Sequence, residues 1–313
     1  MARNKITVAG AGNVGATAAF IAANEQLGDV VLVDIVDGLP QGKALDMNQA
    51  SPVQAYDCNL VGTTDWAQTA SSDVVIITSG MPRKPGMSRD DLLAKNVEIV
   101  KSVTAQAVKY SPDAFIIVVA NPLDAMAYTA AKVSGLAKNK IMGMAGALDC
   151  ARFNYFISQE LGVSIEDIKG VLMGGHGDSM VPLPRFTTVA GIPLSDLTTQ
   201  EKIDAMVDRT RKGGIEIVNL MGTSAYYAPA AGAVKMAEAI LKDRKSVICS
   251  CVCCEGQYGI EGYYVGVPAI IGAGGIEKII ELKLNDDEKA LLATSAEAVK
   301  NLSAKVDGFL TTK

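Results

Sequence analysis

The 313-residue sequence lacks the features that mark several classes of protein. No apolar run approaches the roughly 20 residues that cross a bilayer, so we expect no membrane partner. Basic residues do not outnumber acidic ones, and a net charge of −5 offers no basic face for nucleic acid. Glycine (30) and proline (11) are too sparse for a collagen-like or linker-rich chain. Because 49% of the residues are apolar and 20% charged, the chain is not disordered, and its length favours two domains.

Cysteine is also scarce, with six residues, and no export signal precedes the first predicted strand near Lys5. We therefore expect reduced thiols and a cytoplasmic location. Four of the six cysteines stand close together, at Cys249, Cys251, Cys253 and Cys254. They could form a metal or redox cluster, but alternate residues of a strand lie roughly 6.5 Å apart and cannot easily share one zinc ion. We expect no metal here: the cysteines act as small buried residues, with Cys254 on the opposite face.

The first half of the chain alternates short apolar runs with longer amphipathic stretches. Uninterrupted apolar runs are typical of parallel strands that are buried on both faces. The pattern predicts strands at 6–9, 30–33, 74–77 and 115–119, and a helix at 13–27. This is the rhythm of an α/β protein with a doubly wound, mostly parallel sheet, the Rossmann fold.

The second half has a different pattern, typical of an α+β domain. It predicts helices at 147–161, 201–220 and 230–242, a capped helix start at Asn285, and strands at 245–254 and 263–271. We therefore divide the chain into a dinucleotide-binding domain, 1–143, and a catalytic domain that binds substrate, 144–313.

A glycine-rich turn, Gly10-Ala11-Gly12-Asn13-Val14-Gly15, follows the first strand and opens the first helix. Such a turn lets the backbone approach a pyrophosphate, whose charge the helix N-terminus stabilises. Asp34 follows 19 residues after Gly15, at the end of the second strand, where a carboxylate binds a ribose 2′-OH and favours NAD over NADP. The alternatives are a turn without a ligand, or another adenosine ligand such as S-adenosylmethionine.

The sequence contains a single histidine, His176, which lies among glycines after a short predicted strand. An imidazole has an ordinary pKa of about 6.5 and can exchange protons near neutral pH, so His176 is the one candidate for an acid/base histidine. The alternative is a structural histidine. Asp149 and Arg152 are three residues apart, on one face of a predicted helix. They could orient an imidazole and bind a carboxylate, or form an ordinary surface ion pair.

Two loops follow predicted strands at the edge of the sheet where ligands bind. The first, 81–89, carries Arg83, Lys84 and Arg89, and a helix follows from Asp90. This loop could close on an anionic substrate, or it could be a solvated charged turn. The second begins at Asn121, whose amide could bind a substrate hydroxyl or a nicotinamide, or simply end the strand.

Taken together, these motifs resemble the lactate/malate dehydrogenase family over nearly the whole chain. The matching pieces are GAGNVG, Asp34, PRKPGMSRDDLLAKN, VVANPLD, LDCARF, GGHGDS and EGYYVGVPAIIG. The MPRKPGMSR loop is similar to the malate-specific enzymes of the lactate-dehydrogenase-like branch. The resemblance implies a Rossmann domain, NAD as cofactor, reversible hydride transfer between (S)-malate and oxaloacetate in the tricarboxylic acid cycle, and a homodimer or homotetramer.

The resemblance also implies residue roles. His176 would exchange the substrate proton, Asp149 would pair with it, and Arg89 would polarise the carbonyl. Arg152 and Arg83 would bind the two carboxylates, and Asn121 would also contact substrate. The implied cofactor-binding residues are Gly10, Ala11, Gly12, Asn13, Val14, Gly15, Asp34, Asn96, Val119, Ala120 and Asn121.

Arg83 would determine whether the site prefers a dicarboxylate or a monocarboxylate substrate. A closed site with one cationic clamp would leave a charge of malate unpaired, which is costly. In the family that the chain resembles, lactate dehydrogenases carry a neutral glutamine at this loop position. The small residues Thr223, Ser224 and Ala225 leave room for the larger substrate. The alternatives are a lactate or other 2-hydroxy-acid dehydrogenase, and a non-catalytic NAD-binding protein.

Overall fold

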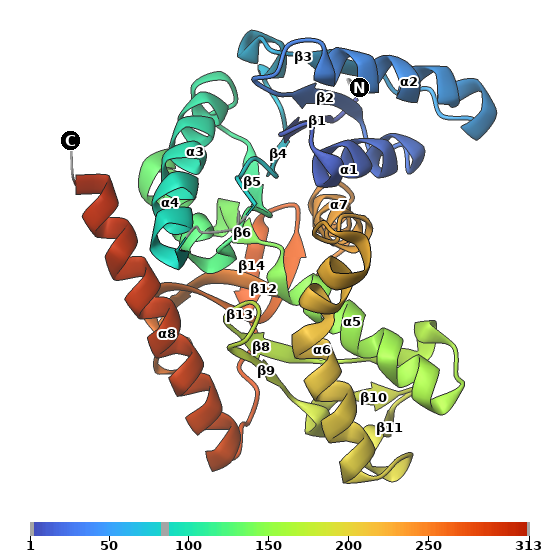
Figure 1. Ribbon diagram of the computed structural model, residues 1–313, viewed down its shortest axis with the longest axis vertical. Helices are drawn as coiled ribbons and strands as arrows, with labels where there is room; N and C mark the ends of the chain where they lie inside the picture. Colours follow the sequence, from blue (N-terminus) through green and yellow to red (C-terminus); the bar gives the residue numbers. More distant parts are fainter. Residues whose placement is uncertain (1–2, 83–87, 312–313) are drawn as a thin grey trace.

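One mixed sheet of 11 strands runs through the computed structural model, which describes residues 3–82 and 88–311 (Figure 1). Its order is β3-β2-β1-β4-β5-β6-β12-β13-β8-β9, with β14 paired to β13. The parallel strands are β1 (Lys5–Ala9), β2 (Asp29–Val33), β3 (Leu60–Thr63), β4 (Val74–Ile77), β5 (Phe115–Val118) and β6 (Ile141–Gly143). The four strands predicted in this half are confirmed, each end within one residue. Because the strand order reverses between β1 and β4, a ligand crevice is expected at their carboxyl ends.

Helices cover both faces of this parallel half. They are α1 (Asn13–Asn24), α2 (Leu39–Gln54), α3 (Arg89–Tyr110) and α4 (Leu123–Ser134). The helix predicted at 13–27 ends three residues early, because Gln26 takes a left-handed conformation (φ 51°) and turns the chain toward β2. Helix α2 was not predicted, since Leu45 and Val53 point to solvent and leave no continuous apolar face in the sequence.

The second half adds antiparallel strands to the same sheet. They are β8 (Leu172–Gly174), β9 (Met180–Pro182), β12 (Ser246–Glu255), β13 (Glu261–Gly272) and β14 (Gly275–Ile279). Cys251 of β12 pairs with Gly143 of β6 and so joins the two halves. A separate small sheet contains β7 (Ile168–Lys169), β10 (Thr188–Val189) and β11 (Ile192–Pro193). The predicted mixture of helices and strands is confirmed here, with boundaries within three residues.

Four long helices complete the second half: α5 (Ala145–Leu161), α6 (Gln200–Met221), α7 (Tyr227–Leu241) and α8 (Asp286–Thr311). Helix α7 packs against α1, and α8 packs along α3 and α4 (Figure 1). Short 3-10 helices are η1 (Trp66–Thr69), η2 (Lys138–Lys140), η3 (Ile165–Asp167), η4 (Pro184–Phe186), η5 (Leu194–Asp196) and η6 (Gln257–Gly259). In the described residues no helix is both long and apolar enough to cross a membrane.

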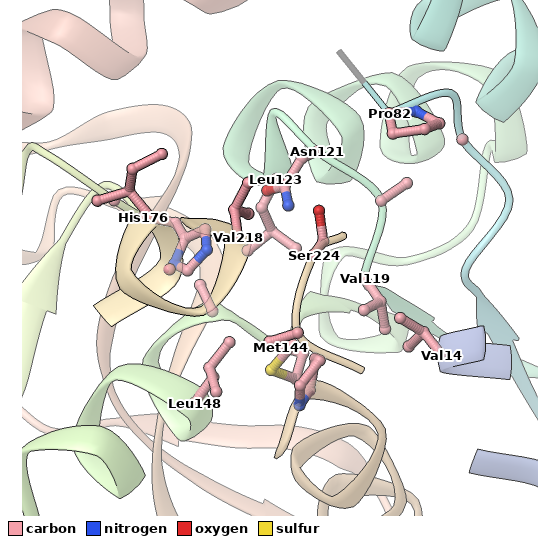
Figure 2. A pocket seen from close by; sticks show the side chains of 18 of the residues that line it. Val14, Pro82, Val119, Asn121, Leu123, Met144, Leu148, His176, Val218 and Ser224 are labelled. Atoms are coloured by element: carbon pink, nitrogen blue, oxygen red, sulfur yellow. The ribbon is translucent and has the colours of Figure 1, made fainter. Parts of the chain in front are cut away.

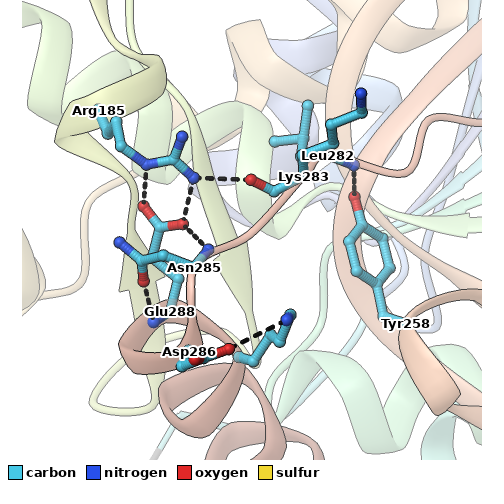
Figure 3. A network of polar contacts seen from close by, with 8 residues as sticks. Arg185, Tyr258, Leu282, Lys283, Asn285, Asp286 and Glu288 are labelled. Atoms are coloured by element: carbon cyan, nitrogen blue, oxygen red, sulfur yellow. Dashed lines mark hydrogen bonds and ion pairs between the residues drawn. The ribbon is translucent and has the colours of Figure 1, made fainter.

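The predicted capped start of α8 is confirmed and is tied to η4 (Figure 3). The Asn285 side chain accepts the Glu288 N–H at 2.8 Å, and the Glu288 carboxylate accepts the Asn285 N–H at 2.9 Å. Arg185 also donates to both oxygens of Glu288, at 3.1 and 2.6 Å. Hydrogen bonding from Arg185 lowers the pKa of Glu288 despite its burial. The start of the last helix is therefore tied to the segment that follows β9.

The cysteines of β12 are buried, as expected. Cys251 and Cys253 belong to the core packed against α3 and α4, whereas Cys254 belongs to the core on the side of α1 and α7. The predicted opposite orientation of Cys254 is therefore confirmed. Cys251 also makes a polar contact, described below, that the reading as a simple apolar filler did not foresee.

The absence of a side chain at Gly15 allows α1 to pack closely against β1. A Cβ atom on Gly15 would lie 1.8 Å from the carbonyl oxygen of Gly10, whereas one on Gly42, inside α2, would meet nothing within 4 Å. We expect Gly15→Ala to destabilise the protein by about 1–3 kcal/mol or more, and Gly42→Ala to be neutral or slightly stabilising. Thermal unfolding without cofactor measures both variants. Equal midpoints for the two would contradict this account of the turn.

Candidate active site

A cavity of about 700 Å³ opens at the carboxyl ends of the parallel strands. Figure 2 shows Val14 and Val119 at one end and His176 at the other, with Asn121 and Ser224 between them. The cavity therefore connects the glycine-rich turn side of the molecule to the histidine. Its walls also include Asn96, Ala120, Met144, Leu148 and Arg152.

The glycine-rich turn is built to accept an anion. Gly10 has a φ of +108°, which favours glycine, and a Cβ atom on Gly12 would meet nothing within 4 Å. No side chain caps the N-terminus of α1, so the N–H groups of its first turn are available to a phosphate. Asp34, after β2, accepts the backbone N–H of Ala11 at 2.5 Å and so lies beside the turn. These residues fit a dinucleotide whose ribose lies near Asp34.

Asn96 joins the two loops that end β4 and β5. Its side chain is buried; its carbonyl oxygen accepts the Met81 N–H at 2.7 Å, and its amide group donates to the carbonyl oxygens of Met81 (3.1 Å) and Asn121 (2.6 Å). Both loops line the cavity. Asn96, predicted as a cofactor-site residue, therefore positions the cavity wall as well as lining it.

His176 and Asp149 form a buried pair at the substrate end of the cavity. Nδ1 of His176 lies 2.9 Å from the carboxylate of Asp149, and their side chains are 17% and 4% exposed. Burial alone would lower the pKa of His176, but the charge and hydrogen bond of Asp149 raise it, and Asp124 adds to this while Arg152 opposes it. The net pKa lies above the ordinary value, so the site favours an imidazolium cation.

Arg152 lies beside this pair, with a guanidinium nitrogen 3.6 Å from the other oxygen of Asp149. Burial lowers the pKa of Arg152, and Asp149 partly offsets that effect. Nε of Arg152 and Oδ1 of Asp149 are both buried and have no hydrogen-bond partner among the described residues. An unpaired buried N–H group on a cation is costly, so this corner of the cavity is suited to an anionic ligand. The surface ion pair, which was the alternative reading, is therefore wrong.

Helix α6 contributes residues that the sequence reasoning did not single out. A Cβ atom on Gly213 would lie 3.2 Å from Cδ of Arg152, and one on Gly214 would lie 3.7 Å from its guanidinium. These glycines give Arg152 its room, and the available signal was a Gly-Gly pair inside a predicted helix, where glycine is unfavourable. Arg211 also lines the cavity, with Nε buried and unpartnered.

Arg89, one of the two predicted loop arginines, is not among the residues that line the cavity. Arg89 was expected on the loop, but it is the first residue of α3 because Ser88 caps the helix in a reciprocal pair of hydrogen bonds with Asp91. Its side chain is 83% exposed and lies 3.8 Å from Asp178, two residues after His176. Arg83 lies outside the described residues.

The remaining predicted residues lie in or next to the cavity. Of the implied cofactor-binding set, the cavity walls contain Val14, Asn96, Val119, Ala120 and Asn121. The others form the adjacent turn or the end of β2: Gly10, Ala11, Gly12, Asn13, Gly15 and Asp34. Ser224 and Ala225, two of the three small residues expected at the pocket wall, also line the cavity. No group of three or more metal-ligating side chains is found in the part of the chain that the structure describes.

The chain is similar to known proteins in sequence and fold. The NAD-binding domain of lactate/malate dehydrogenases matches residues 4–143, and the α/β C-terminal domain of the same enzymes matches residues 146–310. A malate dehydrogenase of Roseiflexus castenholzii is 57% identical over 96% of this chain and 97% of its own. The structure of a malate dehydrogenase from Salinibacter ruber superposes with a TM-score of 0.94 at 53% identity, covering 97% of this chain and 98% of that one.

A lactate dehydrogenase of Cryptosporidium parvum, solved with lactic acid and NAD, has a TM-score of 0.95 at 45% identity, covering 98% of this chain and 99% of that one. The fold alone therefore does not separate the two activities. From the two matched domains and these relatives, the chain belongs to the lactate/malate dehydrogenase family.

Proposed function

We propose that the protein is an NAD-dependent malate dehydrogenase that interconverts (S)-malate and oxaloacetate, a reaction of the tricarboxylic acid cycle. The observation that carries the proposal is the buried group of His176, Asp149 and Arg152 at the end of a cavity that leads from a dinucleotide-binding turn. An acid/base group and an unpaired guanidinium N–H suit a substrate with a hydroxyl next to a carboxylate.

NAD fits the first half of the site through the uncapped first turn of α1 and the carboxylate of Asp34. When bound, NAD⁺ supplies the nicotinamide ring that accepts a hydride from carbon 2 of malate. The chain's own residues determine where that ring lies. Val14, Val119 and Ala120 form an apolar wall, and Asn121 offers an amide between that wall and His176. We propose that Asp34 binds the adenosine ribose and disfavours a 2′-phosphate.

His176 accepts and donates the proton of the substrate hydroxyl. With Nδ1 hydrogen-bonded to Asp149, the neutral ring leaves Nε2 free to take the hydroxyl proton of malate as the C2–H bond breaks. In the opposite direction the imidazolium returns that proton to the oxygen of oxaloacetate. Asp149 keeps the ring in one orientation and stabilises its cation.

Arg152 binds the carboxylate next to the reacting carbon through its guanidinium, whose Nε–H lacks a partner among the described residues. Arg89 stands at the start of α3, beside the histidine loop, and we propose that it moves inward to polarise the carbonyl. Asn121 contributes a hydrogen bond to substrate. Arg83 takes the second carboxylate and so selects a four-carbon diacid over pyruvate.

The exposed surface of the described residues indicates that the protein forms an oligomer. Large apolar side chains are exposed on α2 and around the junction of α6 and α7: Leu45, Val53, Ile215, Leu220, Met221 and Tyr227. Exposed apolar surface of this kind marks protein interfaces, so we propose a homodimer or homotetramer. The six cysteines form no disulfide, which favours a reducing, cytoplasmic location.

We also propose that the boundary between the two domains lies near residue 144.

The pH dependence tests the role of the buried pair. Oxaloacetate reduction needs the imidazolium, so its rate falls as pH rises through the raised pKa of His176, whereas malate oxidation rises. Asp149→Asn removes the charge that raises the pKa of His176 most, so that pKa should fall. Reduction at neutral pH should fall by about 100-fold or more.

His176 is the only histidine, so a single imidazole resonance in the NMR spectrum of the untagged protein reports its titration directly. Asp113→Asn, an exposed carboxylate at the opposite edge of the sheet, serves as control. An unchanged titration midpoint in Asp149→Asn would contradict the pairing.

Substrate choice tests the role assigned to Arg83. The wild-type protein should oxidise NADH with oxaloacetate far faster than with pyruvate. Arg83→Gln should lower kcat/KM for oxaloacetate by about 30- to 1000-fold, the loss of one buried charge pair, and leave pyruvate turnover unchanged or higher. Lys84→Gln removes the neighbouring charge and is the matched control.

Three other results would count against the proposal. Preference of the wild type for pyruvate would support a lactate dehydrogenase instead. Binding of NADH without turnover, unaffected by His176→Asn, would support a non-catalytic protein. Oxaloacetate turnover that survives Arg83→Gln unchanged would overturn the specificity argument alone.

A further inference from the structure

Asp124 is a buried carboxylate for which the proposed reaction has no role. It lies in the first turn of α4, is 4% exposed, and is absent from the walls of the cavity. A carboxylate removed from water needs donors, so its partners indicate why it is there.

Both oxygens of Asp124 accept hydrogen bonds from distant segments. Oδ2 accepts the backbone N–H of His176 at 3.0 Å, and Oδ1 accepts the thiol of Cys251 on β12 at 3.2 Å. Asp124 thereby joins α4, the central cysteine of the unusual strand and the loop that carries the histidine. His176 is contacted by two carboxylates, Asp149 at its ring and Asp124 at its backbone.

The sheet beneath Asp124 is made of small residues. Gly143, Cys251, Gly266 and Gly174 are neighbours across β6, β12, β13 and β8. A Cβ atom on Gly266 would lie 2.4 Å from the carbonyl oxygen of Gly174, and one on Gly143 would lie 2.9 Å from Cβ of Cys251. Within this row, Cys251 is the one residue whose side chain can donate a hydrogen bond, which explains a thiol at this position.

The backbone around His176 is fixed on both sides. The Gly175 N–H donates to Oγ of Ser295, on α8, at 2.8 Å, and the same hydroxyl donates to the carbonyl oxygen of Ser179 at 2.7 Å. With the contact from Asp124, the segment that presents the imidazole is held at three points, Gly175, His176 and Ser179. Such support fixes a catalytic side chain at its working position.

The groups that face Asp124 and His176 shift their pKa values in opposing directions. Burial raises the pKa of Asp124, and the His176 N–H and the Cys251 thiol oppose that rise, as does the charge of His176, while Asp149 adds to it. In return, Asp124 raises the pKa of His176 together with Asp149, against burial and Arg152. Loss of the thiol donor would therefore favour protonated Asp124 and weaken its support of the imidazolium.

We propose that Asp124 is a positioning residue for His176. The Cys251 thiol supports it by donating the hydrogen bond that stabilises the buried Asp124 carboxylate. The pair fixes the backbone of the histidine and, together with Asp149, stabilises its cation. This rests on the proposed function, because it assigns His176 the proton transfer.

Asp124→Asn is the first test, since the amide oxygen can still accept the His176 N–H while the negative charge is lost. In NMR titrations the midpoint of His176 should fall by about one pH unit. The pH profile of oxaloacetate reduction should move the same way, and kcat at neutral pH should fall about tenfold or more. KM and the Kd of NADH, measured by fluorescence titration, should stay within about twofold, because Asp124 is absent from the cavity walls.

Cysteine variants supply the second test and decide the matter if Asp124→Asn does not fold. Cys251→Ala removes the thiol donor and Cys251→Ser restores one. Cys253→Ala removes the same group from a buried thiol whose one hydrogen bond within the described part of the chain is to the Cys254 carbonyl oxygen, 3.9 Å away. We expect Cys251→Ala to lower kcat and the His176 midpoint, Cys251→Ser to recover both, and Cys253→Ala to change neither.

Two outcomes overturn the inference: a folded Asp124→Asn with wild-type kcat and His176 midpoint, or equal behaviour of Cys251→Ala and Cys253→Ala. Failure of the wild-type protein to reduce oxaloacetate is a different result and would refute the proposed function. The NMR midpoint needs no substrate, so it still reports on Asp124 in that case.

Discussion

The site depends on how a buried imidazole is made basic in a place where burial alone would make it acidic. Asp149 contacts the ring and Asp124 contacts the backbone behind it, and both carboxylates are almost inaccessible to water. Desolvating two carboxylates is expensive, and their partners offset part of the cost. Asp124 accepts hydrogen bonds from two other segments, whereas Asp149 pairs with His176 and with Arg152 on its own helix. When the imidazole gains a proton, it partly neutralises both. The arrangement thus ties the favourable protonation state of His176 to the packing of α4, α5 and β12.

That packing exists because the two halves share one sheet. The parallel strands end at β6, where Cys251 of β12 pairs with Gly143, and the antiparallel strands continue to β8 and the histidine. Glycines on the neighbouring strands let helix α4 come close enough to bury Asp124. The glycine-rich turn after β1 and the histidine after β8 thereby meet at one cavity. A rigid sheet transmits their relative position more reliably than a flexible linker would.

Much of this could be predicted where the signal is local. Uninterrupted apolar runs identified β1, β2, β4 and β5, and the glycine-rich turn identified the coenzyme end. Helix α2 was missed because its apolar residues face outward. The partnership of Asp149 with His176 came from family resemblance, since no local pattern states which distant residues meet. Asp124 was overlooked for the same reason, and Cys251 was read as an apolar filler because a thiol's hydrogen bond depends on a residue 127 positions away.

Substrate choice within this family is a matter of charge in a closed cavity rather than of fold. The lactate dehydrogenase of Cryptosporidium parvum and the malate dehydrogenase of Salinibacter ruber superpose almost equally well on this chain. Arg152 and His176 suit the part that lactate and malate have in common, a hydroxyl beside a carboxylate. Discrimination therefore requires a group that meets the part they do not share. An unpaired carboxylate in a closed site costs several kcal/mol, as does an unpaired guanidinium. The role proposed for Arg83 would therefore favour the diacid and disfavour the monoacid at once.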